Sequence, residues 1–471
     1  MPAPSPTALS RPVLLVVALS VALSLWLALR FPLVDPDEGR NAEVAREMSV
    51  DHDVVIPHLA GMPYLDKPPA LFVAAALSIR LLGHTPFAAR VPALLASLGT
   101  LLLLARASVR LEPDGHAARA VLFTAAAPLF AVLSAYVIFD MPLTACVTAV
   151  WTGIALEMAG GESARRRAAM FLAVALGVLL KGPVMLAWAI GGSVAAALVL
   201  RERAPLRWLT WWPGWLVVLA LAGGWFTLAL RRHPEYARYA FVEESLERMT
   251  SGSFKREQPW WFVPAVFIGG ALPWSLATPW RWPVSRATRV AAGFVAFAAV
   301  FFSASHSKLV TYLLPAFPAL AWWAAEAWRR PAPGLPRALL AALAVLPAVL
   351  VAGSPWIARY ARAQSGAPLA AALEQAHAAT VRYEACYSPG SDYLMGRRSP
   401  IVSTRGRELT SNYIIRYRAT LQARGQWRLH DSPDTAPPAD VVVTPPGRTA
   451  PVASELFRDH RFVAVRPGST R

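Results

Sequence analysis

The sequence is poor in charged residues, which make up 16% of its 471 positions, and it has only two cysteines. Cys146 lies in an apolar run and Cys386 in the C-terminal part. Neither a disulfide framework nor a Cys-rich metal site is therefore expected. Hydrophobic residues make up 55% of the chain, more than in an ordinary soluble domain. This composition predicts a membrane protein.

The hydrophobic residues fall into runs of about twenty residues, the length that crosses a bilayer as a helix. The first run, 12–29, lies between Arg11 and Arg30 and lacks a small-residue cleavage site, so we expect a retained span. The net charge of +17 would suggest nucleic acid for a soluble chain. Here the excess Arg lies in short loops between apolar runs. This placement is better explained by the rule that positively charged loops stay on the cytoplasmic side of a membrane. We therefore expect no nucleic-acid partner.

The Arg-rich loops are assigned to the cytoplasm: 106–119, 165–167, 201–207, 281–289 and 329–337. The expected spans are 12–30, 86–105, 119–138, 141–159, 168–181, 183–200, 210–230, 260–280, 288–304, 309–328 and 337–356. About eleven crossings place the N-terminus inside and the C-terminus outside. The fold class expected is an all-α polytopic membrane protein.

Two segments outside the spans complete the architecture. The apolar stretch 69–82 is short and contains Arg80, so we expect an interfacial helix within a long external first loop, 31–85. Beyond Trp356 the sequence turns polar and contains short β-like runs at 441–444 and 461–465. The predicted domains are a transmembrane domain, 1–356, and a small external α/β domain, 357–471.

Polar motifs gather on the predicted outer face, where positive charge is otherwise sparse. They are DPDEGR (35–40), YLDKPP (64–69), Asp140, Lys181, Glu243 and Glu244 with Arg248, and SKLVTY (307–312). Only four of the 46 Lys and Arg residues are Lys, and three of these four, Lys67, Lys181 and Lys308, lie in these motifs. An ammonium group acts as a compact point charge and suits a phosphate. Chance placement is the alternative explanation.

In the first loop, Asp35 is expected to cap a helix that begins at Pro36 and has Glu38 at its third position. On that helix Asp37 and Arg40 would share a face. A capped surface helix with an ordinary Asp–Arg pair explains this segment alone equally well.

These motifs resemble those of the aminoarabinose transferases that modify lipid A, within the GT-C glycosyltransferases that also include protein O-mannosyltransferases. The first loop carries the resemblance in DEGRNAE (37–43), DVVIPHL (53–59) and YLDKP (64–68). Later matches are DMPL (140–143), LKGP (180–183), QPWW (258–261), LPWS (272–275) and SKLVTYLLP (307–315). The resemblance covers roughly residues 1–330.

Two departures from the family pattern concern chemistry. The chain has Glu244-Ser245 where the aminoarabinose transferases commonly have Glu-His, and Asp66-Lys67 where they have Glu-Lys. His58, His84, His233 and His306 form no close pair with ligand spacing. We expect no required cofactor and no required metal, with a divalent ion left as the open alternative.

The resemblance implies an enzyme that transfers a hexosyl or pentosyl group from a polyprenyl-phosphate sugar to a lipid A-type lipid, an envelope glycan or a protein. It would act among membrane lipids, on the periplasmic face of a bacterial inner membrane. Lys67 and Arg248 would hold the donor phosphate, with Arg40, Tyr64, Lys181, Lys308 and Tyr312 around it. Asp37 would be the base or acceptor-orienting carboxylate and Asp140 its neighbour, with Glu38, Asp66 and Glu244 as further candidates.

Other acceptors and another class of protein remain as alternatives. A protein O-mannosyltransferase or an oligosaccharyltransferase would share the architecture and differ in acceptor. A non-enzymatic polyprenyl-lipid transporter would be expected to show repeated halves or charges within span centres. The sequence shows no internal repeat, and its charged motifs cluster on one predicted face instead.

Overall fold

The computed structural model describes residues 10–112, 115–247, 257–328, 337–448 and 452–467. The chain divides into two compact units. The helical unit contains Met1–Leu27 and Ala93–Ala352, and the mixed unit contains Ala28–Pro92 and Gly353–Arg471. The predicted first loop and the predicted C-terminal domain therefore belong to the same unit.

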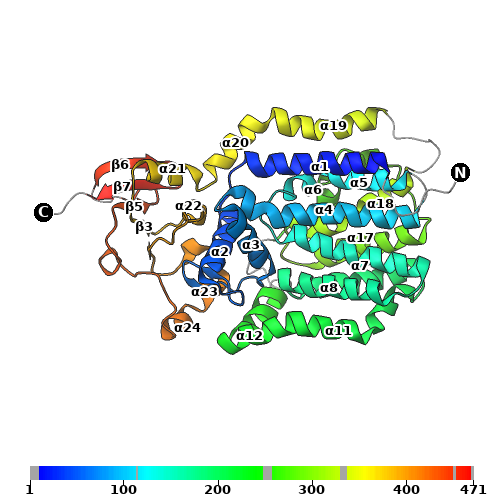
Figure 1. Cartoon of the computed structure of the whole chain (residues 1–471), viewed down its shortest axis with the longest axis horizontal. Coiled ribbons are helices and arrows are strands. Elements are labelled where there is room, and N and C mark those ends of the chain that lie inside the picture. The colour runs from blue at the N-terminus through cyan, green and yellow to red at the C-terminus, as the bar shows by residue number, and fades with distance from the viewer. Residues whose placement is uncertain (1–9, 113–114, 248–256, 329–336, 449–451, 468–471) are drawn as a thin grey trace. The chain divides into compact units, whose positions relative to one another are not determined.

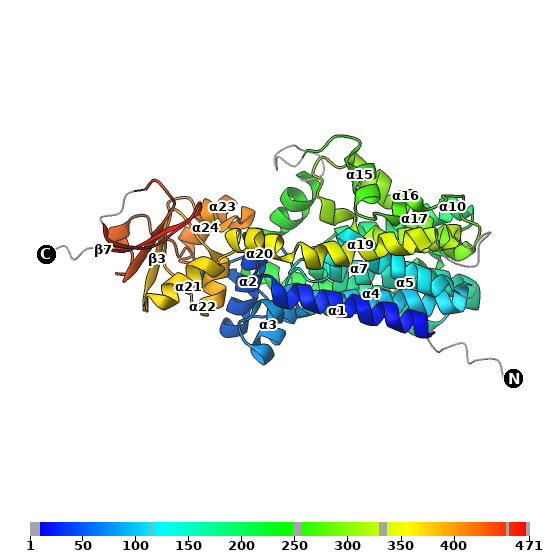
Figure 2. The same cartoon turned by 90° about the horizontal axis from the view of Figure 1, so that it is seen from above.

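The helical unit is built from helices of very different lengths (Figures 1 and 2). The elements are α1 (Arg11–Arg30), α4 (Pro86–Leu111), α5 (His116–Ala126), α6 (Pro128–Leu133), α7 (Asp140–Gly160), α8 (Ala164–Lys181), α9 (Val184–Leu186), η1 (Ala187–Gly191), α10 (Gly192–Leu200), η2 (Ala204–Thr210), α11 (Trp212–Val218), η3 (Leu219–Gly223), α12 (Gly224–Arg232), α13 (Tyr236–Arg238), η4 (Tyr239–Glu247), α15 (Phe262–Gly269), α16 (Trp274–Ala277), α17 (Arg286–Ala304), η6 (Val310–Ala316), α18 (Phe317–Ala327) and α19 (Arg337–Ala352). Helices α1 and α4 each run across the boundary into the mixed unit.

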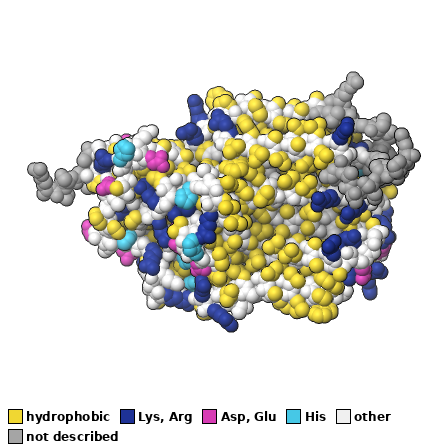
Figure 3. Space-filling model, in the orientation of Figure 1, with side chains coloured by type: hydrophobic (Ala, Val, Ile, Leu, Met, Phe, Trp, Pro, Cys, Tyr) yellow, Lys and Arg dark blue, Asp and Glu magenta, His cyan; other side chains and the backbone are white. Residues whose placement is uncertain are grey.

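Five segments of the described chain are long and apolar enough to cross a membrane: Arg11–Arg30, Pro86–Leu111, Asp140–Gly160, Trp212–Arg232 and Arg286–Ala304. A sixth is possible if the bent pair Ala341–Ala352 and Ser354–Ala363 forms one span. The prediction of several apolar membrane helices is confirmed, and the count of eleven stays a prediction. Figure 3 shows hydrophobic side chains gathered over α1, α4, α7 and α8.

Breaks within two of the apolar runs account for part of the difference in number. The run 119–138 is divided between α5 and α6 at Ala127, which is extended because Pro128 follows it. The run 260–280 forms only α15 and α16, and Gly269, Gly270 and Pro273 lie around the interruption. These residues disfavour a continuous helix, so hydrophobicity alone overestimates helix length there.

The helices pack closely where small residues meet. Helix α10 lies against α17, α7 against α8, and α5 against α18. A Cβ atom on Gly293 of α17 would lie 2.4 Å from the Cα atom of Ala196 in α10. Only glycine allows the two backbones to approach this closely, as is common between membrane helices.

The Arg-rich connections of the helical unit meet at one end of its helices. Ser285 hydrogen-bonds Glu112, and Arg286 forms an ion pair with Glu202. The Arg119 Nε donates to the Ala325 carbonyl over 3.3 Å. These contacts join three loops that were predicted to share the cytoplasmic side: 106–119, 201–207 and 281–289. The first of these loops also contacts the end of α18.

The mixed unit combines short helices with a five-stranded sheet. Its first-loop segment contains α2 (Asp37–Asp51), the hairpin β1 (His58–Leu59) and β2 (Met62–Pro63), and α3 (Ala70–Leu82). Its C-terminal segment contains α20 (Ser354–Ala363), α21 (Ala367–Gln375), β3 (Val381–Glu384), α22 (Pro389–Met395), β4 (Ile401–Val402), η7 (Arg407–Leu409), α23 (Asn412–Arg416), α24 (Arg418–Ala423), η8 (Pro433–Thr435), β5 (Val441–Thr444), β6 (Val452–Arg458) and β7 (Val463–Pro467).

The sheet has the strand order β4-β3-β5-β7-β6. Strand β3 is parallel to β4 and β5, whereas β7 is antiparallel to β5 and β6. Val442, Val463 and Val465 form a small apolar cluster on the sheet. The α/β character predicted for the C-terminal part is confirmed, and the strand predicted at 441–444 has those bounds.

Candidate functional site

In the helical unit, the predicted residues Asp140, Lys181 and Tyr312 lie together. Asp140 is the first residue of α7 and Lys181 the last residue of α8. Lys181 Nζ donates to the Asp140 carboxylate and lies 4.4 Å from the centroid of the Tyr312 ring. Lysine thus neutralises a carboxylate and contacts an aromatic face within a largely buried cluster, which we call the helical-unit cluster.

The position of this cluster follows from the α7–α8 hairpin. The hairpin turns between Gly160 and Ala164, where Arg167 pairs with Glu157 at 3.1 Å and with Glu162 at 2.9 Å. Helix α7 has 21 residues, a length of about 31 Å at 1.5 Å per residue. Asp140 and Lys181 therefore lie about one hydrocarbon thickness from the Arg-rich turn.

Three other predicted residues belong to the helical unit. Lys308 is largely buried, and its Nζ donates to the Gln258 carbonyl over 3.2 Å. Glu244 lies in η4, close to Glu243, which pairs with Arg238 at 3.3 Å. Arg248 lies outside the described residues.

In the mixed unit, Asp37, Arg40 and Tyr64 form a second group, which we call the first-loop cluster. Arg40 Nη2 donates to the Asp37 carboxylate over 2.7 Å, as expected for residues that share a helix face. The Asp37 side chain remains 63% exposed, whereas that of Arg40 is 14% exposed. The Arg40 guanidinium carbon lies 5.9 Å from the centroid of the buried Tyr64 ring. The cluster thus combines an accessible carboxylate with an oriented cation.

Asp66 and Lys67 follow Tyr64 in the same segment. The Asp66 carboxylate is buried and accepts a hydrogen bond of 3.0 Å from the backbone N–H of Tyr413. Lys67 Nζ is half-buried and donates to the Asp66 carbonyl over 2.7 Å. Asp66 therefore joins this segment to the C-terminal segment, which is a positioning contact.

The expected helix cap at Asp35 is wrong. Helix α2 begins at Asp37, and Pro36 at its N-cap position makes no side-chain capping bond. The Asp35 carboxylate instead accepts from Ser388 Oγ over 3.2 Å and lies 3.6 Å from Arg461. Burial raises the pKa of Asp35 to about 6, although Arg461 opposes this shift. Asp35 thus contacts Ser388 and Arg461, which lie far away in the sequence, and does not cap α2. The local sequence pattern could not predict these partners.

Glu38 lies in a buried ion pair. Its carboxylate accepts from Arg90 Nε over 2.9 Å and from Arg90 Nη2 over 2.8 Å, and both side chains are almost fully buried. It also accepts from the Val34 N–H over 3.1 Å. Arg90 further donates to the carbonyls of Ala28 and Phe31. These contacts give Glu38 a role in positioning the start of α2.

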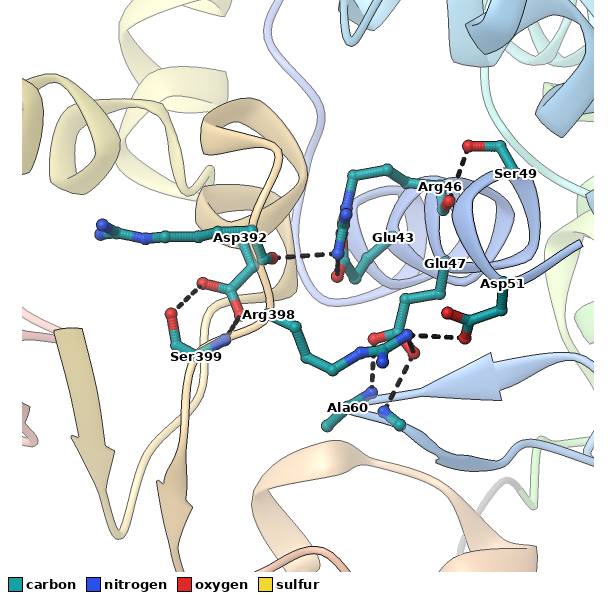
Figure 4. Close-up of polar contacts among 11 residues, drawn as sticks. Glu43, Arg46, Glu47, Ser49, Asp51, Ala60, Asp392, Arg398 and Ser399 are labelled. Carbon is teal, nitrogen blue, oxygen red and sulfur yellow. Dashed lines mark hydrogen bonds and ion pairs between the residues drawn. The ribbon is translucent and has the colours of Figure 1, made fainter. Parts of the chain in front are cut away.

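Sequence reasoning missed an ionic network, buried at its Glu43, Arg46 and Glu47 members, that attaches α2 to the C-terminal segment (Figure 4). Arg46 pairs with Glu43 at 2.6 Å and donates to the Arg397 carbonyl over 3.0 Å. Arg398 pairs with Glu47 at 2.9 Å and with Asp51 at 2.7 Å. Glu43 lies one turn and Glu47 two turns after Arg40 on a polar helix, and this charge pattern alone does not indicate burial.

The same network also holds the hairpin that leads to Tyr64. Glu47 accepts hydrogen bonds from the backbone N–H groups of Ala60 and Gly61 over 2.7 and 2.9 Å. Ala60 and Gly61 both have positive φ angles, of 52° and 70°, as a tight hairpin turn requires. Since Tyr64 follows this hairpin directly, the buried Glu47 carboxylate helps to place the first-loop cluster.

No group of three or more His, Cys, Asp or Glu side chains within the described ranges has an arrangement that could hold a metal ion. Asp37 pairs with Arg40 and Asp140 with Lys181, so both predicted carboxylates face cations. The prediction that no metal is required stays a prediction.

The chain is similar to known proteins over much of its length. Residues 66–225 match the family described as dolichyl-phosphate-mannose-protein mannosyltransferase. The undecaprenyl phosphate-alpha-4-amino-4-deoxy-L-arabinose arabinosyl transferase of Aeromonas salmonicida is 31% identical over 302 residues, which cover 62% of this chain and 55% of that protein. The corresponding protein of Pseudomonas aeruginosa is 31% identical, with 61% and 54% covered. The resemblance to the aminoarabinose transferases is confirmed. The match spans about half the length of these curated relatives.

A solved structure extends the likeness to aminoarabinose transferases over nearly the whole chain. The crystal structure of ArnT from Cupriavidus metallidurans bound to undecaprenyl phosphate superposes with a TM-score of 0.79 and 26% identity. The superposition covers 97% of this chain and 98% of that chain. The membrane glycosyltransferase fold is thus shared by both units, including the C-terminal segment, where the sequence resemblance was weak.

Proposed function

We propose that this protein transfers a sugar from a polyprenyl-phosphate-linked donor to an acceptor on the periplasmic face of a bacterial inner membrane. The observation that carries the proposal is the likeness, over nearly the whole chain, to a structure holding undecaprenyl phosphate. The two clusters support it, since each contains a cation beside a carboxylate. The acceptor class that we favour is a lipid A-type lipid, which the motifs resembling those of the aminoarabinose transferases imply.

The reaction requires an acceptor oxygen to attack the anomeric carbon of the donor. The bond from that carbon to the phosphate oxygen breaks, and the polyprenyl phosphate leaves with the electron pair. The protein must therefore stabilise charge that develops on phosphate and must orient the acceptor. We assign the phosphate to Lys67 and Arg248, with Arg40, Lys181, Lys308 and Tyr312 as supporting residues.

The carboxylates take different parts in this proposal. Asp37 is the more exposed, so it is the group that an acceptor can reach. It would accept the proton of a hydroxyl acceptor, whereas an acceptor phosphate is already anionic and would need only orientation. Asp140 is buried against Lys181 and would set the position and charge of that lysine.

The orientation of the protein in the membrane is part of the proposal. The Asp140–Lys181 pair lies at the opposite end of α7 from the Arg-rich turn, and positive loops favour the cytoplasmic side. If the Arg-rich end is cytoplasmic, the helical-unit cluster would lie on the periplasmic side, as we propose. We assign the C-terminal α/β segment to the same side as the first loop, to which it is bonded.

A protein O-mannosyltransferase activity is the second candidate, because the matching family carries that description. One experiment separates the two. The purified full chain is given undecaprenyl-phosphate aminoarabinose or polyprenyl-phosphate mannose, each with lipid A or with a mixture of envelope proteins, and products are identified by mass spectrometry. A modified lipid A supports the first proposal and a glycosylated protein the second. Absence of transfer from every polyprenyl-phosphate donor would remove both.

A further inference from the structure

The C-terminal segment supplies one residue directly to the first-loop cluster. Thr410, 370 positions from Arg40 in the chain, accepts two hydrogen bonds from Arg40 Nη1. One goes to its backbone carbonyl over 3.0 Å and one to its side-chain hydroxyl over 2.6 Å. One guanidinium nitrogen thus donates to two atoms of a single residue, which restricts the orientation of the guanidinium group.

Thr410 has an unfavourable backbone conformation. Its φ angle is +52°, in the left-handed region that a β-branched residue rarely adopts. The residue is also exposed, so packing in a core does not account for its identity. Strain of this kind persists where surrounding contacts determine it and gathers at functional sites. The contact that this conformation makes possible is the double acceptance from Arg40.

The loop around Thr410 is held firmly. Ser403 Oγ donates to Glu408 over 2.5 Å and accepts from the Gly406 N–H over 2.9 Å. On the other side, Ser411 Oγ accepts from the Ile414 N–H and so caps α23. The Tyr413 N–H then donates to Asp66, the residue before Lys67. Two motif residues of the first loop, Arg40 and Asp66, are thus bonded to one braced stretch, 403–414.

The orientation that Thr410 imposes leaves one donor of Arg40, the Nε–H group, for a ligand. Nη2 donates to Asp37, and Nε is buried and has no hydrogen-bond partner among the described residues. A buried donor on a cation without a partner is costly, and an anion would satisfy it. Because Nη2 is already bonded to Asp37, Nε is the donor that remains for a phosphate oxygen.

We propose that Thr410 is a positioning residue, which turns Arg40 so that its Nε edge receives the phosphate of the polyprenyl-phosphate donor. This inference rests on the proposed function, because it assigns a task within the same site. It gives the C-terminal segment a part in donor binding that the sequence left open. Thr410 itself does not touch the reacting atoms.

The test measures binding of undecaprenyl phosphate to the purified full chain in nanodiscs, together with thermal stability. T410A removes the hydroxyl and should weaken binding by about tenfold, as loss of a hydrogen bond to a charged group does. T410S keeps the hydroxyl and should restore binding to within about threefold. T404A, at another exposed threonine of the same segment, is the matched control and should bind like the wild type.

A double-mutant cycle separates positioning from a general structural effect. If Thr410 acts through Arg40, T410A should weaken binding in the wild type and have no further effect in an R40A background. Equal losses in both backgrounds, or wild-type binding by T410A, would overturn the inference while leaving the proposed function intact. If the wild type itself binds no undecaprenyl phosphate, the proposed function fails and this inference fails with it.

Discussion

Lys181, the last residue of α8, donates a hydrogen bond to Asp140, the first residue of α7. Their side chains are only 13% and 4% exposed, so neither charge is well hydrated. Removing one partner of such a pair leaves an uncompensated buried charge, which typically costs about 3–5 kcal/mol. The pair thus links the stability of the α7–α8 hairpin to the proposed chemistry.

We therefore expect Asp140→Asn and Lys181→Met each to lower thermal stability strongly, and the double variant to lose less than the sum of the two. Thermal unfolding of the purified protein measures this. The control is Arg286→Met, which breaks the more exposed pair with Glu202 and should cost no more than about 1 kcal/mol. Equal effects of Asp140→Asn and Arg286→Met would contradict the structural role of the buried pair.

Replacing Lys67 by Met keeps much of the side-chain length and removes the ammonium charge. We expect membrane insertion to persist and sugar transfer to fall by at least about a hundredfold, as loss of a key stabilising donor commonly does. Transfer from a polyprenyl-phosphate sugar by the purified variant is the measurement. Turnover at the wild-type rate would show that Lys67 is an ordinary interfacial lysine.

Asp37→Asn should also abolish most transfer, but for a different reason. The carboxylate is 63% exposed and is assigned to the acceptor, so donor binding should remain. A binding assay with undecaprenyl phosphate separates this lesion from that of Lys67→Met, which should weaken binding. Loss of donor binding in Asp37→Asn would show instead that Asp37 contributes to phosphate binding, through its hydrogen bond with Arg40.

The absence of the Glu-His pair at Glu244-Ser245 predicts activity without a divalent ion. Transfer by protein treated exhaustively with a chelator should match that of untreated protein. Loss of transfer that a single divalent ion restores would contradict this expectation. Asp37 and Asp140 would then be the first candidate ligands, since carboxylate oxygens bind such ions.

Sequence reasoning found the apolar helices and the local pairs, because both are encoded within a few residues. The face shared by Asp37 and Arg40 follows from helix geometry and was predicted correctly. Asp140 was expected beside Asp37, and Lys181 around the donor phosphate. Their direct pairing was not expected, since it depends on the packing of α7 against α8.

Local sequence patterns could not predict the long-range contacts of the mixed unit. Arg40 and Thr410 are separated by 370 positions, and Glu47 and Arg398 by 351. Neither hydrophobic periodicity nor a turn signal relates residues so far apart in the chain. From its own sequence, the segment of helix α2 was therefore explained equally well as a surface helix. Its burial against the C-terminal segment comes from ion pairs, which composition does not reveal.

Burial in the mixed unit makes a prediction about pH. Burial raises the pKa of Asp35 and that of Asp392 from 3.8 to about 6. The charge of Arg461 opposes this shift at Asp35, and the hydrogen bonds from Ser399 oppose it at Asp392. A carboxyl whose pKa is higher in the folded state binds its proton more tightly there. Its contribution to stability is therefore greatest below the unfolded pKa and declines as pH rises from about 4 to about 6.

Asp35→Asn should remove this decline for one group, because the amide stays neutral at every pH. The free energy of unfolding of the variant, relative to the wild type, should rise between pH 4 and pH 7 by up to about 3 kcal/mol. Thermal or denaturant unfolding across this pH range measures the difference. Glu455→Gln is the control: hydrogen bonding to Arg458 lowers the pKa of this exposed carboxyl, so its effect on the pH dependence has the opposite sign. An Asp35→Asn difference that is constant with pH would show that Asp35 titrates alike in the folded and unfolded chains.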